Sequence, residues 1–218
     1  MPPLGASSPI ASSAAASSPC PHCAAGLAAT AGPPGATTRS GLPKGLKPTI
    51  PGGLVQVDTL AVHVAPDRAI KHFTVYDLVA TWTVGLAAHR ATAAASARFL
   101  DKLLADMPFP VQAIQVDGGS EFKAGFEAAC QKTGIALHEL PPKRPQLNGA
   151  VERCNSAWRY EFYSDDDLDP TIADINPILE AFHHLYNHHR PHGVLAGMTP
   201  AAHLAERRAD ETHTSHLP

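Results

Sequence analysis

From residue 54 onward, hydrophobic and polar positions alternate along the chain, as they do in a strand with one buried face. Within residues 54–60, Val55 and Val57 fall on one face of the extended chain, and Gln56 and Asp58 fall on the other. Two apolar, β-branched segments follow after short breaks and predict two further strands, 70–78 and 82–88. Such short connections predict an antiparallel meander.

Helices are predicted to alternate with two more strands in the rest of the chain. A helix is expected over 92–107, where large apolar side chains recur at helical spacing, and Pro108 and Pro110 end it. The other expected elements are strand 111–117, helix 120–133 capped by Gly134, strand 135–140, helix 146–163, an acidic break at 165–169, and helices 172–186 and 200–208. This order predicts an α/β, ribonuclease H-like fold: a mixed five-stranded sheet with helices on both faces.

Residues 1–50 differ in composition from the rest of the chain. They are rich in Ala, Ser, Pro and Gly, and their few large apolar side chains cannot offset the entropy lost on ordering. We therefore expect a disordered segment or linker over 1–50, the catalytic core over 51–165 and a helical C-terminal extension over 166–218. Cys20 and Cys23 have the spacing of a zinc knuckle but lack a second ligand pair nearby, which favours incidental cysteines.

Composition limits the function classes. No apolar run approaches the ~18 residues of a membrane helix, and four cysteines are too few and scattered for a disulfide framework, so we expect a cytoplasmic protein without membrane partners. The formal net charge of −3 does not indicate a nucleic-acid binder, because such proteins usually carry a basic surplus. Any DNA contact therefore requires a local basic surface.

Three acidic residues are predicted to meet at one edge of the sheet. Asp58 lies on the polar face of the first strand, Asp117 ends the fourth, and Glu152 lies early on the helix after the fifth. Two unit charges ~4 Å apart repel by about 4 kcal/mol at an effective dielectric constant near 20, and a divalent cation relieves that repulsion. Carboxylate ligands favour Mg²⁺ or Mn²⁺. Each acid taken alone is more simply a solvated surface charge.

Longer motifs surround two of these acids. Residues 115–122, around Asp117, and residues 145–153, around Glu152, resemble the second-aspartate and glutamate motifs of the DDE integrase core, which insertion-sequence transposases and retroviral-type integrases share. Between the two acids lie 34 residues, the spacing of that family. Residues 186–192 and 199–200 resemble the tail of the bacterial transposase branch.

The resemblance implies metal-dependent DNA strand cleavage and transfer in transposition or integration. Asp58 and Asp117 would flank two Mg²⁺ or Mn²⁺ ions, and Glu152 would complete the second site. The implied partners are transposon-end and target DNA and further copies of the chain, which would associate with the bacterial nucleoid. The family usually has Asn after the second aspartate, where this chain has Gly118. Because that position is not a metal ligand, we expect modulated rather than lost activity.

A basic strip flanks the predicted site and consists of Lys143, Arg144, Arg153 and Arg159. Phosphate contacts from such residues would position DNA without reading its sequence. A helix surface without function explains the strip equally well.

Four histidines lie close together in the sequence: His183, His184, His188 and His189. His184 and His188 have the i, i+4 spacing of a zinc-binding pair, but packing and hydrogen bonding is the favoured interpretation of the cluster. Cys130 and Cys154 fall on predicted buried helix stripes.

Two other functions stay open. The branch normally carries a helix-turn-helix region ahead of the core, and residues 1–50 do not resemble one. A truncated, non-catalytic relic or regulator of a full-length transposase fits that observation. A ribonuclease H-like nuclease without strand transfer is the other alternative, and the transposase-type tail disfavours it.

Overall fold

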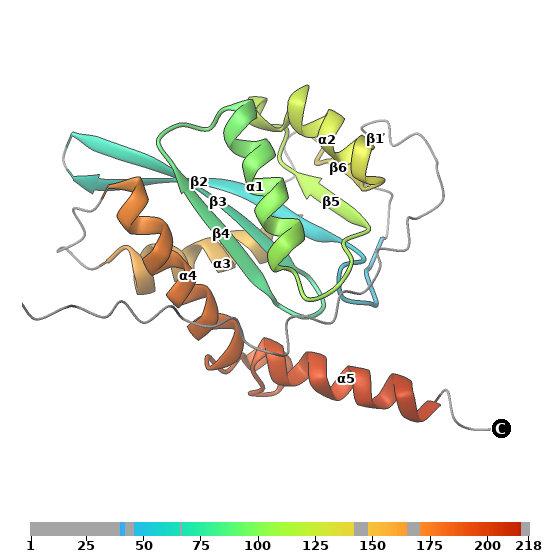
Figure 1. Cartoon of the computed structure of the whole chain (residues 1–218). Coiled ribbons are helices and arrows are strands. Elements are labelled where there is room, and N and C mark those ends of the chain that lie inside the picture. Colours follow the sequence, from blue (N-terminus) through green and yellow to red (C-terminus); the bar gives the residue numbers. More distant parts are fainter. Residues whose placement is uncertain (1–39, 42–45, 66, 142–147, 165–170, 215–218) are drawn as a thin grey trace, which may run out of the picture. The chain divides into compact units, whose positions relative to one another are not determined.

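The computed structural model describes residues 40–41, 46–65, 67–141, 148–164 and 171–214, which lie in one compact unit. They form a mixed sheet with strand order β1-β6-β5-β2-β3-β4 (Figure 1). The strands are β1 (Ser40–Gly41), β2 (Val55–Ala65), β3 (Arg68–Asp77), β4 (Thr83–Ala88), β5 (Ala113–Val116) and β6 (Ala136–Glu139). The helices are α1 (Ala93–Asp106), α2 (Gly125–Thr133), α3 (Gly149–Ala157), α4 (Ile172–His188) and α5 (Pro200–Thr214), with the short turns η1 (Ser120–Phe122), η3 (Trp158–Phe162) and η4 (Gly193–Leu195).

The predicted fold class is confirmed. Strands β2, β3 and β4 form the antiparallel meander, while β5 pairs in parallel with β2 and β6 pairs in parallel with β5. The sheet has one strand more than predicted, because Ser40 and Gly41 pair with β6. These two residues lie in the segment 1–50 that was predicted to be disordered or a linker. Residues 1–39, including Cys20 and Cys23, lie outside the described residues.

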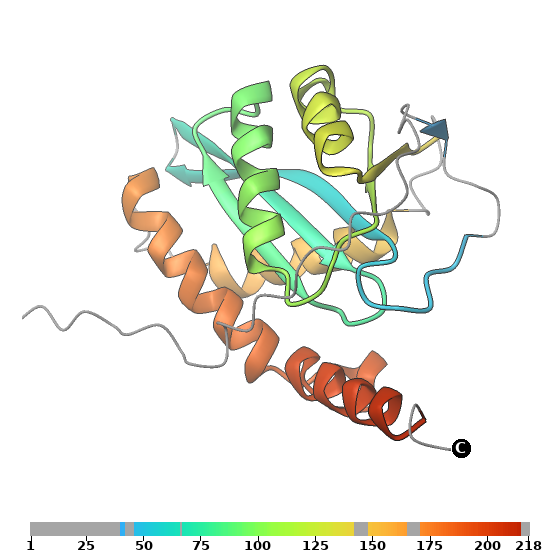
Figure 2. The same ribbon diagram turned by 45° about the vertical axis from the view of Figure 1, so that its right-hand side comes forward.

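The sheet separates two hydrophobic cores, as the alternation along β2 requires. Val57 belongs to the core beneath α1 and α2, whereas Leu60 belongs to the core beneath α3 and α4. Figure 2 shows the two pairs of helices on opposite faces of the sheet. Within the described residues, no helix is long and apolar enough to span a membrane.

The helix predicted over 120–133 is two separate pieces. The 3-10 turn η1 is followed by Ala124, whose φ of +47° interrupts the helix, and α2 then begins at Gly125. The carbonyl oxygen of Glu121 accepts a hydrogen bond of 2.6 Å from the Ser96 hydroxyl on α1. This bond ties η1 to α1 close to the break. Gly134 ends α2 in the left-handed conformation, as predicted.

The helix predicted over 146–163 changes its winding part of the way along. Its described part begins as α3 at Gly149 and continues as the π-helical turn η3, in which the Tyr163 N–H donates to the Trp158 carbonyl. The predicted apolar stripe is buried: Val151, Cys154, Trp158 and Phe162. Residues 146 and 147 lie outside the described residues.

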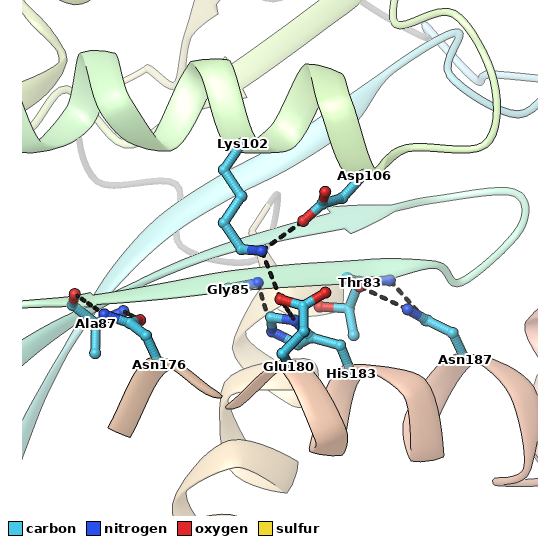
Figure 3. A network of polar contacts seen from close by, with 9 residues as sticks. All are labelled: Thr83, Gly85, Ala87, Lys102, Asp106, Asn176, Glu180, His183 and Asn187. Atoms are coloured by element: carbon cyan, nitrogen blue, oxygen red, sulfur yellow. Dashed lines mark hydrogen bonds and ion pairs between the residues drawn. The ribbon is translucent and has the colours of Figure 1, made fainter. Parts of the chain in front are cut away.

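Helix α4 closes the outer edge of the sheet along β4 (Figure 3). Its side chains bond the outward-facing backbone groups of that strand: Asn187 exchanges two hydrogen bonds with Thr83, Asn176 exchanges two with Ala87, and His183 Nε2 accepts one of 2.7 Å from Gly85 N–H. The helix also supplies Ile175, Leu179 and Tyr186 to the second core. Although residues 166–218 were predicted to be an extension, α4 is therefore built into the core.

Candidate active site

The first acidic residue is fixed on the polar face of β2. Asp58 Oδ1 accepts a hydrogen bond of 2.9 Å from Thr59 N–H, and its Oδ2 accepts one of 2.8 Å from Asn155 Nδ2 on α3. Two residues earlier, the buried Gln56 accepts a bond of 3.1 Å from Val151 N–H through its Oε1. These contacts hold the first turns of α3 against β2.

Asp117 lies at an equivalent position on the neighbouring strand. Strands β2 and β5 are parallel, and Gln56 pairs with Gln115. Asp58 lies two residues after Gln56, and Asp117 lies two residues after Gln115. Asp117 is exposed, and its Oδ1 accepts a bond of 3.0 Å from Gly119 N–H. The turn after it needs a glycine, because Gly118 has a φ of +86°. Glycine is the residue best suited to this conformation.

Glu152 lies in the first turn of α3 and is exposed. Its neighbours along the helix are tied to β2 on either side, since Val151 bonds to Gln56 and Asn155 bonds to Asp58. The docking of α3 therefore brings Glu152 to the strand that carries Asp58.

The electrostatics of Asp58 reflect the presence of the other two acids. Burial raises the pKa of the Asp58 carboxyl, and the negative charges of Asp117 and Glu152 raise that pKa further. The hydrogen bonds from Thr59 N–H and Asn155 act in the opposite direction and lower it. Asp117 and Glu152 therefore both lie within electrostatic reach of Asp58.

The residues fit a divalent cation in their chemistry. All three side chains offer oxygen ligands, the set that Mg²⁺ and Mn²⁺ prefer. In the described part of the chain, no three acidic, histidine or cysteine side chains are gathered closely around one ion-sized point. A divalent cation would offset the repulsion between these three carboxylates. Asn155 Oδ1, buried beside Asp58 and without a partner among the described residues, remains available to a water molecule or ligand of such an ion.

The predicted basic strip is only partly described. Arg153 on α3 and Arg159 on η3 are both exposed, whereas Lys143 and Arg144 lie outside the described residues. Glu161, the acid that accompanies them on η3, forms an ion pair with Arg190 through two hydrogen bonds of 2.6 and 3.0 Å. The solvent-facing side of this helix is therefore more basic than its sequence suggests.

The remaining candidate residues have structural roles. His183 is buried and bonds to Gly85, while the exposed His184 makes ring contacts with His188 and His189. Both Cys130 and Cys154 are buried, as predicted. Burial raises the pKa of the Cys130 thiol to about 12 and that of Cys154 to about 11, which makes both unreactive near neutral pH.

Sequence reasoning missed Gln56 and Asn155, which position the acids without being acids. Asn155 lies three residues after Glu152, on the face of α3 turned toward the sheet. A buried polar residue one helical turn from a predicted ligand is the signal that identifies it. Gln56 carries the same kind of signal, because it precedes Asp58 by two residues on the same strand face.

Replacing Asn155 with Leu should weaken divalent-metal binding. The change removes the donor that orients Asp58 Oδ2, and such outer partners typically contribute roughly 10- to 100-fold to metal affinity. A Mn²⁺ titration followed by electron paramagnetic resonance measures the effect. Ser156→Ala, an exposed change on the same helix, is the matched control. Equal Mn²⁺ affinity in the Leu variant and the wild-type chain would contradict the assigned role.

Comparison with known proteins places this geometry in a family context. Residues 133–200, which include Glu152 and Asn155, match the integrase core domain family. A search of curated proteins found no match to the sequence.

Solved structures resemble this fold over 72–76% of the chain. A chain of the simian T-cell lymphotropic virus intasome in complex with PP2A regulatory subunit B56 gamma has a TM-score of 0.58 and 21% identity, over 72% of this chain and 54% of that one. The HTLV-2 integrase catalytic core domain in complex with magnesium has a TM-score of 0.56 and 16% identity, over 72% and 98%. The BIV integrase catalytic core domain has a TM-score of 0.56 and 20% identity, over 76% and 99%.

The extent of these matches differs. The chain spans about half the length of the simian virus protein and nearly all of the two isolated core domains. The family match covers the segment that holds Glu152, and the matches to the two core domains cover 72% and 76% of this chain. Residues 133–200 thus match an integrase core domain in sequence, and the chain resembles the HTLV-2 and BIV integrase core domains in fold.

Proposed function

We propose that the chain catalyses metal-dependent DNA strand cleavage and transfer in transposition or integration. The observation that carries the proposal is the placement of three acids: Asp58 and Asp117 at equivalent positions of neighbouring parallel strands, with Glu152 docked beside them by α3. The proposed partners are transposon-end DNA, target DNA and further copies of the chain. The proposed site of action is the bacterial nucleoid.

The proposed roles follow from the geometry. Asp58 and Asp117 would flank two Mg²⁺ or Mn²⁺ ions, and Glu152 would complete the second ion site. When bound, the ions activate the attacking oxygen and stabilise the leaving oxygen of a phosphodiester. Asn155 and Thr59 N–H fix the Asp58 carboxylate before the ions bind, so little reorganisation remains. Water would be the nucleophile for cleavage, and the freed 3′-hydroxyl the nucleophile for joining.

A single assay separates this function from its alternatives. The chain is incubated with a labelled DNA duplex and a circular target in Mg²⁺ or Mn²⁺, and both cut and joined products are measured. Cut and joined products together support the proposal. Cut product without joined product indicates a nuclease without strand transfer, and neither product, from a folded chain that binds DNA, indicates a non-catalytic regulator.

We expect Arg159→Ala to weaken the binding of every DNA sequence about equally. The exposed guanidinium would contact phosphate, which carries no base information, and losing one contact should reduce the slope of log K against log salt by about 0.9. Fluorescence anisotropy at several salt concentrations measures both quantities. Arg98→Ala, an exposed arginine of α1 on the other face of the sheet, is the control. A loss confined to one DNA sequence would instead show that Arg159 reads bases.

A further inference from the structure

One aromatic side chain of this protein is exposed to solvent. Every Phe, Trp and Tyr of the chain lies in its described part, and all are buried or half-buried except Tyr160, whose exposed fraction is 70%. Its neighbours on η3, Trp158 and Phe162, face the second core. Tyr160 is therefore the one Phe, Trp or Tyr ring that the described part of the protein presents to a partner.

The backbone that carries Tyr160 is firmly held. Trp158 is fully buried and makes ring contacts with His72, His183 and Tyr186, among others. The π-turn bond from Tyr163 N–H to the Trp158 carbonyl spans the position of Tyr160, and the Ser164 hydroxyl donates to the Tyr160 carbonyl. Single π turns within helices often occur at functional sites. The ring is thus presented from a rigid support, which lowers the entropy that a ligand must offset.

The surroundings of Tyr160 favour an anionic ligand. Arg159 adjoins it and Arg153 lies seven residues earlier, which places all three side chains on the exposed side of the same helix. Among the described residues, neither arginine forms an ion pair, while the nearby Glu161 is neutralised by Arg190. An aromatic ring flanked by two guanidinium groups has the composition of a surface that binds single-stranded nucleic acid.

The spacing connects this surface to the candidate active site. Tyr160 follows Glu152 by eight residues, which corresponds to roughly 12 Å along a helix. One DNA strand advances ~3.4 Å per nucleotide, so a strand leaving the acids along this helix would bring its third or fourth nucleotide to the ring. We infer that Tyr160 stacks on an unpaired base of the bound DNA strand, with Arg153 and Arg159 holding the adjacent phosphates. This inference rests on the proposed function.

An unpaired base is the ligand that the chemistry selects. Within a duplex the faces of the bases are covered by their neighbours, so a protruding ring reaches a free face only on an unpaired or terminal base. A second copy of the chain would also cover the ring, but two exposed guanidinium groups beside it match the regularly spaced phosphates of a DNA strand, which a protein surface does not present.

The test compares two DNA probes that differ only in their bases. Both are one duplex with a four-nucleotide single-stranded extension, which carries thymines in one probe and abasic sugars in the other, so their phosphate charge is the same. Wild-type protein should bind the thymine probe roughly 5- to 150-fold more tightly, the range expected for stacking on one base. Tyr160→Ala should remove this difference, whereas Tyr160→Phe should keep it. Val194→Ala, a change at a similarly exposed apolar residue on η4, should keep it too.

The outcomes separate the inference from the proposed function. If wild-type protein binds neither probe, the proposed function and the inference both fail. If it binds both probes and Tyr160→Ala keeps the preference for thymines, only the inference fails. A Tyr160→Ala variant that loses self-association on sedimentation while retaining the preference would assign the ring to a contact between copies and likewise overturn the inference.

Discussion

Replacing Asp117 with Asn should abolish divalent-dependent DNA cleavage while leaving the fold intact. Asn keeps an Oδ1 that can accept the bond from Gly119 N–H, and the side chain is exposed, so packing does not change. What disappears is one negative charge from the metal site. At about 4 kcal/mol for a close charge pair, the cleavage rate should fall roughly 1000-fold or more. The measurement is the initial rate of duplex nicking in Mn²⁺, with circular dichroism as the check on folding.

The control for this change is Asp101→Asn. Asp101 is also an exposed aspartate, but it lies on α1, across the sheet from α3, and its loss removes the same charge from the protein. It should cleave DNA at the wild-type rate. If the two variants retain equal activity, Asp117 does not belong to the catalytic site, and the acids near Asp58 have another role.

Acidification should destabilise the protein through His72. This residue is fully buried between Trp158 and Tyr163, with its Nδ1 2.9 Å from the tyrosine hydroxyl. Burial, together with the charge of His183, lowers the pKa of His72 to about 3, whereas an unfolded chain has a value near 6.5. Below pH ~6.5 the unfolded chain binds a proton that the folded chain excludes. The contribution of neutral His72 is therefore fully present above pH ~6.5 and is lost progressively as the pH falls toward 3.

The expected slope is up to ~1.4 kcal/mol of unfolding free energy per pH unit between pH 6 and pH 4. Urea unfolding at several pH values measures it. The variant His72→Phe should lower this slope by close to the amount of one proton, even if it is less stable at pH 7. His184→Gln, at an exposed histidine, should leave the slope unchanged. An identical slope in His72→Phe and wild-type protein would show that other groups govern the acid sensitivity.

The elements that follow one simple period were predictable from the sequence. Strand β2 alternates at period two, and the apolar stripe of α3 recurs at helical spacing, so both appeared with the correct faces. Asp58, Asp117 and Glu152 could be selected because strand ends and motifs marked them. The negative charges of Asp117 and Glu152 act on Asp58, and the assignment of the three residues to one site stays a prediction.

The features that were not predictable depend on contacts between distant segments. The π turn at Trp158 preserves the i, i+4 pattern of an α-helix, so periodicity cannot distinguish the two. The break at Ala124 lies close to the contact between Ser96 and Glu121, which no local pattern reports. Gln56 and Asn155 resembled ordinary polar residues until the docking of α3 showed what each one bonds.

The closure of the sheet edge by α4 also determines how the chain tolerates change. If another strand paired with β4, its backbone groups, which every sequence supplies, would bond the outward-facing N–H and C=O groups of β4. Here three particular side chains of α4 make those hydrogen bonds instead. On α4, His183 and Asn187 are ~6 Å apart along the helix axis, and their partners Gly85 and Thr83 are ~6.8 Å apart along the strand. Inserting or deleting one residue in α4 would rotate this set by about 100° and separate it from the strand. The helix therefore tolerates substitutions on its outer face but no change of length between Asn176 and Asn187, because that spacing must match the spacing of their partners on β4.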